Sequence, residues 1–72
     1  MSFFTTAYIL ETYGMRLNIE QTAHALGMAT STVYNKISAG TFKVPSYVED
    51  GKRWIDHRDL VQYLDDCRAR AE

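Results

Sequence analysis

Short polar side chains gather between residues 30 and 40, at a spacing that places them on one side of a helix. With Val33 and Ile37 one turn apart on the apolar side, an advance of about 100° per residue puts Asn35 opposite them. An asparagine makes two hydrogen bonds to the edge of adenine, and hydroxyl and amino groups bond bases or phosphates. This chemistry suits contact with the DNA major groove. The residues assigned to that contact are Thr30, Ser31, Thr32, Tyr34, Asn35, Lys36 and Ser38.

Two larger side chains, Tyr34 and Lys36, flank this polar arc. A long side chain at the edge of the helix reaches the phosphate backbone on the wall of the groove, so both suit phosphate contacts. Tyr34 has a second interpretation, because its ring can also cover the core. The polar face as a whole can likewise be an ordinary solvated helix surface, but the helix-turn-helix pattern around it favours DNA contact.

The preceding residues predict a first helix and a tight turn, the order of a helix-turn-helix. Ile19, Ala23 and Leu26 repeat at helical spacing, and the small Ala23 allows two helices to cross closely. Gly27 stands where the first helix must end in a left-handed residue, and Met28 fills the turn. The expected boundaries are Asn18 as first N-cap, a helix over 19–26, Thr30 or Ser31 as second N-cap, and an end at Gly40.

A change of period in the second half of the chain predicts a β-hairpin with strands over 46–48 and 53–55. The dipeptide Asp50-Gly51 between them is a strong hairpin signal, because both turn residues need positive φ. Such a hairpin can serve as a wing that reaches the minor groove, whose negative potential favours arginine. Side chains alternate along a strand, so only one of Lys52 and Arg53 can point fully at DNA. The wing residues assigned to DNA are Lys43, Lys52 and Arg53.

Helices are also expected at both ends of the chain. Asp56 is predicted to cap a closing helix with Asp59 in its first turn, and Thr5 or Thr6 to cap a short helix over 7–13. The expected fold is mainly α with a small β-hairpin, a winged helix-turn-helix. Its expected parts are an N-terminal extension with a short helix (1–16), the winged DNA-binding domain (17–67) and a frayed tail (68–72).

A longer run of residues, from about Leu17 to Leu64, follows a known pattern in order and spacing. The matching positions are 23–27, 31–34, Ile37, Ala39-Gly40, Phe42, Pro45, 51–55, Asp59-Leu60 and Tyr63-Leu64. In these residues the chain resembles the excisionase-like and AlpA-type proteins of phages and mobile elements, which carry a MerR-type winged domain. The resemblance implies binding to double-stranded DNA, with the second helix in the major groove and the wing in the neighbouring minor groove. It also implies a role, since many of these proteins steer an integrase towards excision and some regulate promoters.

The composition argues against several other classes of protein. The 72 residues make one small domain without a Gly-rich phosphate loop, a nucleophile elbow or paired carboxylates facing one cleft, so no enzyme is expected. Cys67 is the single cysteine, which excludes an intramolecular disulfide, and no Cys/His cluster has zinc spacing. We therefore expect no metal and no cofactor. The sequence lacks a signal-peptide pattern and a long apolar run, so a DNA-associated location in the cytoplasm of a bacterial host cell is expected.

Other conspicuous side chains receive structural interpretations. Trp54 and Tyr47 are expected in the core rather than as a platform for stacking bases. His24 and His57 lack partners at metal or catalytic spacing and are expected on the surface, and Cys67 is expected to be a small apolar filler.

The N-terminal aromatic residues have two interpretations that the sequence leaves open. Phe3, Phe4, Tyr8 and Tyr13 extend the core, or they form a patch for self-association.

The charge distribution bears on the choice between functions. The net charge of −1 is unusual for a DNA-binding protein, but residues 30–58 carry +2 between flanks of −1 and −2.

The leading hypothesis is an excisionase that binds repeated sites near an attachment region with cooperative self-association. The second is a repressor or activator that binds a promoter with the same domain. The third is an adaptor that uses its acidic ends to bind a protein partner and does not bind DNA.

Overall fold

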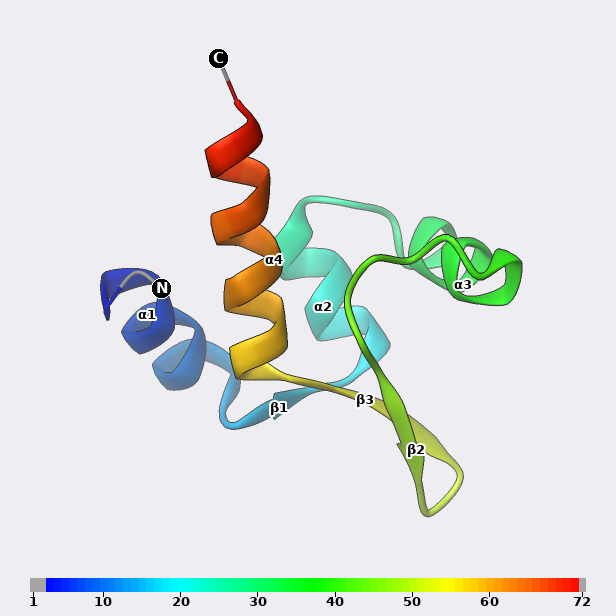
Figure 1. Ribbon diagram of the computed structural model, residues 1–72. Helices are drawn as coiled ribbons and strands as arrows, with labels where there is room; N and C mark the ends of the chain where they lie inside the picture. Colours follow the sequence, from blue (N-terminus) through cyan, green and yellow to red (C-terminus); the bar gives the residue numbers. More distant parts are fainter. Residues whose placement is uncertain (1–2, 72) are drawn as a thin grey trace.

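Four helices and three short strands make up residues 3–71, the part of the chain that the computed structural model describes (Figure 1). In chain order they are α1 (Phe3–Tyr13), β1 (Arg16–Leu17), α2 (Ile19–Leu26), α3 (Thr30–Ala39), β2 (Tyr47–Glu49), β3 (Lys52–Asp56) and α4 (His57–Arg70). The expectation of a mainly helical protein with a small amount of β-structure is confirmed. In Figure 1, α4 stands between α1 on one side and α2 and α3 on the other, with the sheet below them.

The sheet has one strand more than the sequence predicted. Its order is β1-β3-β2, antiparallel throughout, so β3 pairs with the expected hairpin partner on one edge and with β1 on the other. Leu17 lies opposite Ile55, and both are fully buried. The segment around Leu17 reads as extended, but its partner lies far along the chain, and a two-residue strand has no pattern that reveals it. The hairpin turn follows the prediction, with φ of 53° at Asp50 and 77° at Gly51.

Helix α2 and the turn after it follow the prediction closely. The Asn18 side chain accepts a hydrogen bond from the Gln21 backbone at 2.8 Å, and the Gln21 side chain accepts one from the Asn18 backbone at 3.0 Å. This reciprocal capping box satisfies two backbone donors at the helix start. At the other end Gly27 is left-handed, and Met28 donates to the Ala23 carbonyl at 2.9 Å. The turn therefore leads directly into α3.

The predicted cap of α3 is wrong. The N-cap residue is Ala29, without a side-chain hydrogen bond, and neither Thr30 nor Ser31 takes that role. The bond from Met28 back to α2 fixes the turn, so that Ala29 is already the last extended residue. Its carbonyl accepts from Thr32 at 3.0 Å, and Thr30 starts the helix. The predicted end at Gly40 is confirmed, with φ of 72°.

The outer helices are longer than predicted. Helix α1 already includes Phe3, so Thr5 and Thr6 lie within it and are not its caps. Its Ile9 is buried in the core, which attaches α1 to the rest of the protein. Helix α4 begins at the predicted Asp56 cap but continues to Arg70, past the point where fraying was expected.

The two histidines differ in their surroundings. His24 is exposed, as expected, and bonds the Tyr13 hydroxyl at 2.7 Å, which ties α2 to the end of α1. His57 was also expected on the surface, but it is buried. Its backbone N–H and its ring Nδ1–H both donate to the Met15 carbonyl, at 3.0 and 2.7 Å. The ring is buried because the β1–β3 pairing brings that carbonyl to the start of α4.

The core forms where the helices cover one face of the sheet. Its buried side chains come from every element except β2 and include the fully buried Leu17, Val33, Ile55, Leu60 and Val61. Val44, in the loop before β2, closes it.

The only cysteine, Cys67, is half-buried on α4 and not among the core residues, so its expected role as a core filler is wrong. The Tyr63 pKa is raised, chiefly by a hydrogen bond with this thiol.

Asp56 provides a test of the start of α4. The Arg58 guanidinium donates to its carboxylate at 2.9 and 3.0 Å and lowers the pKa of Asp56 from 3.8 to about 2. Because the folded-state pKa is depressed, this group stabilises the fold above about pH 4, and its contribution is lost as the pH falls towards about 2. We expect Asp56→Asn, which keeps a good N-cap, to be less stable than the parent by about 1 kcal/mol at neutral pH. Urea denaturation should show this difference disappearing near about pH 2. A difference that does not vary with pH would contradict the assignment.

Candidate nucleic-acid interface

Helix α3 exposes a continuous polar surface. Only Val33 is fully buried on this helix, and Ile37 packs against the core beside it. Ser31, Thr32, Asn35 and Ser38 are exposed, as their angular positions predicted, while Thr30 and Lys36 are half-buried at the edges. The outward surface of α3 therefore carries small hydrogen-bonding groups with no large apolar side chain at its centre.

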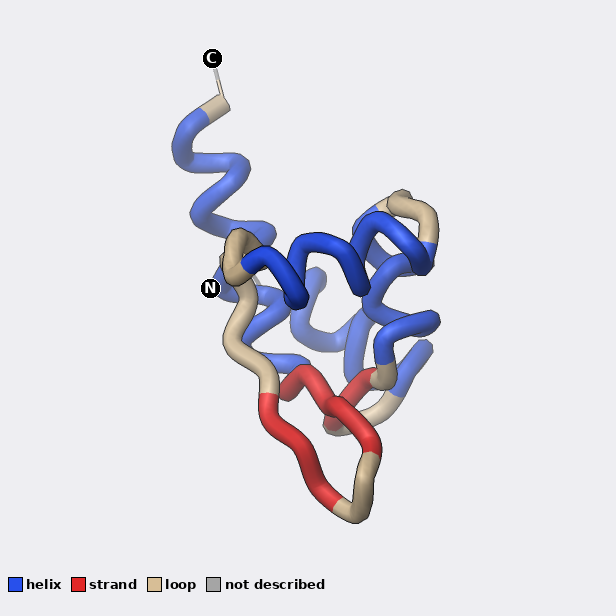
Figure 2. Tube along the Cα trace, turned by 90° about the vertical axis from the view of Figure 1, so that its right-hand side faces the viewer, coloured by secondary structure: helices blue, strands red, loops and turns tan. Residues whose placement is uncertain are grey.

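The hairpin projects on the same side of the molecule. Figure 2 looks onto this side, with α3 crossing in front and the β2–β3 hairpin extending below it. Between them lies an open groove of about 440 Å³, lined by Tyr34 from α3, by Lys52 and Arg53 from the hairpin, and by Asn18 and Glu20 at the start of α2. The ring of Tyr34 is 54% exposed, so it borders the groove and does not cover the core. Of the two positions expected for this ring, the structure therefore has the exposed one.

Lys52 and Arg53 point to opposite faces of β3, as strand alternation requires. The side chain of Lys52 is exposed, opposite Glu49 in the strand register. Arg53 is half-buried and donates from Nη1 to the Ser46 hydroxyl at 2.8 Å. It reaches from the hairpin towards the loop that follows α3. Lys52 is therefore the freely exposed cation of the hairpin, and Arg53 holds the hairpin against the loop.

Arg16 organises the outer face of the sheet, a role that sequence reasoning missed. Its guanidinium lies 4.0 Å from the centre of the Trp54 ring and donates to Glu49 at 2.9 Å. Hydrogen bonding to the Tyr47 hydroxyl and then to Glu49 raises the pKa of Arg16. The prediction that Trp54 and Tyr47 lie in the core is wrong, since Ile55 takes the inner face and alternation turns Trp54 outwards with Tyr47 opposite it. No short-range signal in the sequence joins Arg16 to these residues.

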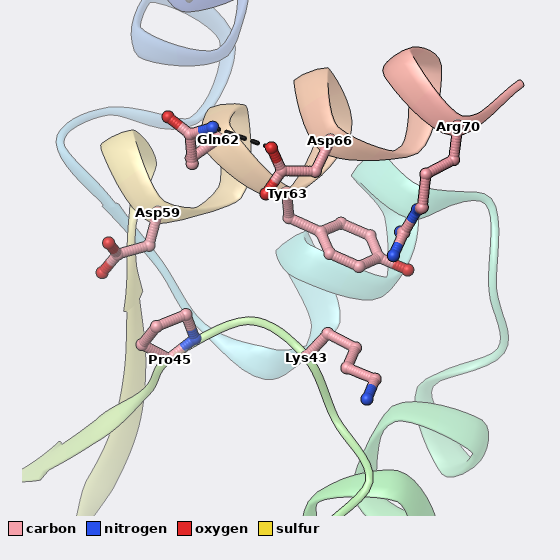
Figure 3. A pocket seen from close by; sticks show the side chains of 7 residues that line it. All are labelled: Lys43, Pro45, Asp59, Gln62, Tyr63, Asp66 and Arg70. Atoms are coloured by element: carbon pink, nitrogen blue, oxygen red, sulfur yellow. Dashed lines mark hydrogen bonds between the residues drawn. The ribbon is translucent and has the colours of Figure 1, made fainter.

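Lys43 lies apart from the groove between α3 and the hairpin. It borders a second open groove, of about 410 Å³, against the outer side of α4 (Figure 3). Carboxylates at Asp59 and Asp66 line the same groove, and Asp66 accepts a hydrogen bond from Gln62 at 2.9 Å. The three predicted wing cations are thus divided, with Lys52 and Arg53 beside α3 and Lys43 beside a part of α4 that carries two aspartates and Arg70.

Within residues 3–71 no group of three or more His, Cys, Asp or Glu side chains is placed to hold a metal ion. None of the described helices has the length and apolar character needed to cross a membrane. What the described surface offers near α3 is a set of neutral hydrogen-bonding groups flanked by cations.

No family model, no curated protein and no solved structure matches this chain.

The outer-face cluster generates a prediction about the hairpin. We expect Arg16→Ala to shift the fluorescence of Trp54 to longer wavelength, because the ring loses its guanidinium cover. Amide exchange in β2 should quicken, since the link to Glu49 is lost, while the free energy of unfolding changes by less than about 1 kcal/mol. Arg68→Ala, which removes an exposed arginine near the end of α4, is the control and should leave both signals unchanged. Unaltered fluorescence and exchange in Arg16→Ala would show that the cluster does not hold the hairpin.

Proposed function

We propose that this chain is a sequence-specific DNA-binding protein with a winged helix-turn-helix domain. In this proposal α3 is the recognition helix in the major groove, and the β2–β3 hairpin is the wing at the neighbouring minor groove. The observation that carries it is the exposed polar face of α3 beside a hairpin whose cations border the same groove. The polar face of α3 is not needed to stabilise the core, because Val33 supplies the fully buried contact of this helix.

The chemistry of α3 supports a division of labour between base and phosphate contacts. Asn35 stands at the centre of the exposed arc, where an amide can make paired hydrogen bonds to adenine. Lys36 and Tyr34 lie at its edges, within reach of the phosphates on either wall of a groove. Ser31, Thr32 and Ser38 are short enough to let the helix approach the base edges closely.

The balance of charges supports binding at this face in spite of the net charge of −1. Glu49 at the hairpin is paired with Arg16, and Asp56 is paired with Arg58, so these carboxylates are largely neutralised. Lys36 and Lys52 have no such partner among the described ion pairs. Phosphate contacts from these two cations predict a salt dependence with a log–log slope of about −2 per chain.

Within this proposal the biological role is that of an excisionase, a protein that bends or organises DNA near an attachment region and directs an integrase towards excision. This role is supported by the resemblance of residues 17–64 to excisionase-like proteins. A single winged module of this size buries only about 600–1,000 Å² on DNA. Several copies on neighbouring sites would therefore be needed for selective binding.

The deciding experiment measures DNA binding by fluorescence anisotropy as a function of salt. Duplexes are taken from attachment regions and from promoters near the gene that encodes this chain. Steeply salt-dependent binding to an attachment region, with stimulation of excisive recombination by the neighbouring integrase, is the expected result. Binding to a promoter alone would assign a regulator of transcription. No binding, or binding without salt dependence, would favour a protein-interaction adaptor.

Asn35 tests the base contact. We expect Asn35→Ala to relax the preference at one base pair and to remove about 1–3 kcal/mol of discrimination, because one pair of hydrogen bonds to a base is lost. Binding to a panel of single-base variants of the site measures this. Thr12→Ala, an exposed substitution on α1, is the control and should retain the full preference. If Asn35→Ala keeps the preference while a hairpin substitution abolishes it, the recognition element is wrongly assigned.

Lys36 tests the phosphate contact. We expect Lys36→Ala to weaken binding to all sequences alike and to reduce the salt slope by about one, because one released counterion is lost. The matched control is Arg68→Ala, which removes an equal charge from α4 and should not alter the slope. Thermal denaturation of both variants should stay within about 0.5 kcal/mol of the parent. An unchanged slope for Lys36→Ala would place this side of α3 outside the complex.

A further inference from the structure

Helix α1 is apolar on both of its faces. Ile9 and Tyr13 pack towards the rest of the protein, while the outward side carries Phe3, Phe4 and Tyr8, which are 80%, 83% and 63% exposed. At about 100° per residue these rings and the exposed Leu10 fall within an arc of about 160°. Thr5 and Thr12 lie between these two sides, and an apolar helix surface is normally covered by other parts of a protein. In the described chain, nothing covers the outer side of α1.

The exposed apolar area is large for one short helix. An aromatic side chain has an area of about 150–250 Å², so the exposed parts of the three rings amount to roughly 400 Å². Burying this face on two molecules, with Leu10 and the flanking atoms, removes about 1,000 Å² from water. That is the area at which a specific interface between two proteins begins.

We infer that α1 is a dimerisation helix whose outer face packs against α1 of a second copy of this chain. A two-fold interface places the same surface on both partners, so it must be complementary to itself. The outer face of α1 offers apolar side chains on both partners, and its one charged residue, Glu11, lies within the same arc and must extend to the rim of the interface, where water solvates it. The absence of Lys and Arg from α1 argues against an anionic membrane surface, since helices that lie on such surfaces carry cations on their polar face.

The position of α1 lets the dimer keep its other surfaces open. In Figure 1 α1 and α3 lie on opposite sides of α4, so contact through α1 leaves α3 and the hairpin accessible on both copies. Dimerisation is independent of DNA binding and is measured without DNA. Combined with the proposed function, it supplies a second DNA-binding face within one particle, which raises the effective concentration at a neighbouring site.

Sedimentation equilibrium under reducing conditions tests the inference, because the reductant excludes disulfides through Cys67. The parent should show a reversible equilibrium between monomer and dimer from micromolar to millimolar concentration. Phe4→Glu and Tyr8→Glu should each weaken the dimer by at least about a hundredfold, because each replaces an apolar ring of the interface by a carboxylate on both partners, two charges in addition to those of Glu11. Both side chains are exposed, so circular dichroism should remain that of the parent.

Val48→Glu is the matched control, since Val48 is an equally exposed apolar residue on the hairpin. It should dimerise like the parent. A parent that stays monomeric over the whole range overturns the inference, as does a dimer that survives both α1 substitutions or is broken by Val48→Glu. Co-sedimentation of the parent with anionic vesicles, lost in Phe4→Glu, would assign the face to a membrane instead.

Discussion

The arrangement of the whole molecule depends on the pairing of two short strands, in which Leu17 lies opposite Ile55. Both side chains are fully buried, so the strands are held by packing as well as by backbone hydrogen bonds. The chain leaves β1 into α2 and α3, while β3 continues into the hairpin on one side and into α4 on the other. The direction of the hairpin relative to α3 is therefore set at this one contact. His57 reinforces it, because it donates twice to the Met15 carbonyl just before β1.

Two arginines transmit this constraint to the hairpin. Arg16 extends from β1 across Trp54 of β3 to Glu49 of β2. It therefore connects the two edge strands of the sheet across the central strand. On the other face Arg53 bonds Ser46 and fixes the base of the hairpin to the loop after α3. An isolated two-stranded hairpin is only marginally stable in water, so these links keep the hairpin at a constant place beside α3. A surface that binds a rigid double helix through two separate elements requires such a fixed spacing.

Features that depend on neighbouring residues were predictable from the sequence. The Asn18 cap, the Gly27 turn and the Asp50-Gly51 hairpin rest on interactions within a few residues, and the structure contains all three. The exposed face of α3 was predictable too, because one helical period and Val33 determine which side chains face outwards. The DNA contacts assigned to that face stay predictions.

Features that depend on distant residues were missed. Arg16 and Glu49 are 33 residues apart, and His57 and Met15 are 42 apart, so no local pattern indicates that they meet. The misplacement of Trp54 has a different cause. The size of the ring favours a place in the core, but Ile55 and Trp54 are adjacent in one strand and cannot both face the core. Ile55 occupies the strand position that faces the core, so the ring of Trp54 lies on the opposite face of the sheet. There the guanidinium of Arg16 covers it.

The pairing of carboxylates explains how a chain with a net negative charge can present a cationic surface. Around the proposed interface Glu49 is engaged by Arg16 and Asp56 by Arg58, while Glu20, which lines the groove, takes part in none of the described ion pairs. Helix α4 is balanced, with three aspartates against Arg58, Arg68 and Arg70, and its Asp59 and Asp66 border a separate groove behind the loop. Electrostatic forces between exposed charges fade over about 8–10 Å in physiological salt, so the field near α3 is governed by Lys36, Lys52 and Arg53 against the single carboxylate of Glu20, rather than by the total charge of the chain. Net charge is therefore a poor guide to nucleic-acid binding in a domain this small, and the distribution of charge over its faces is the quantity that matters.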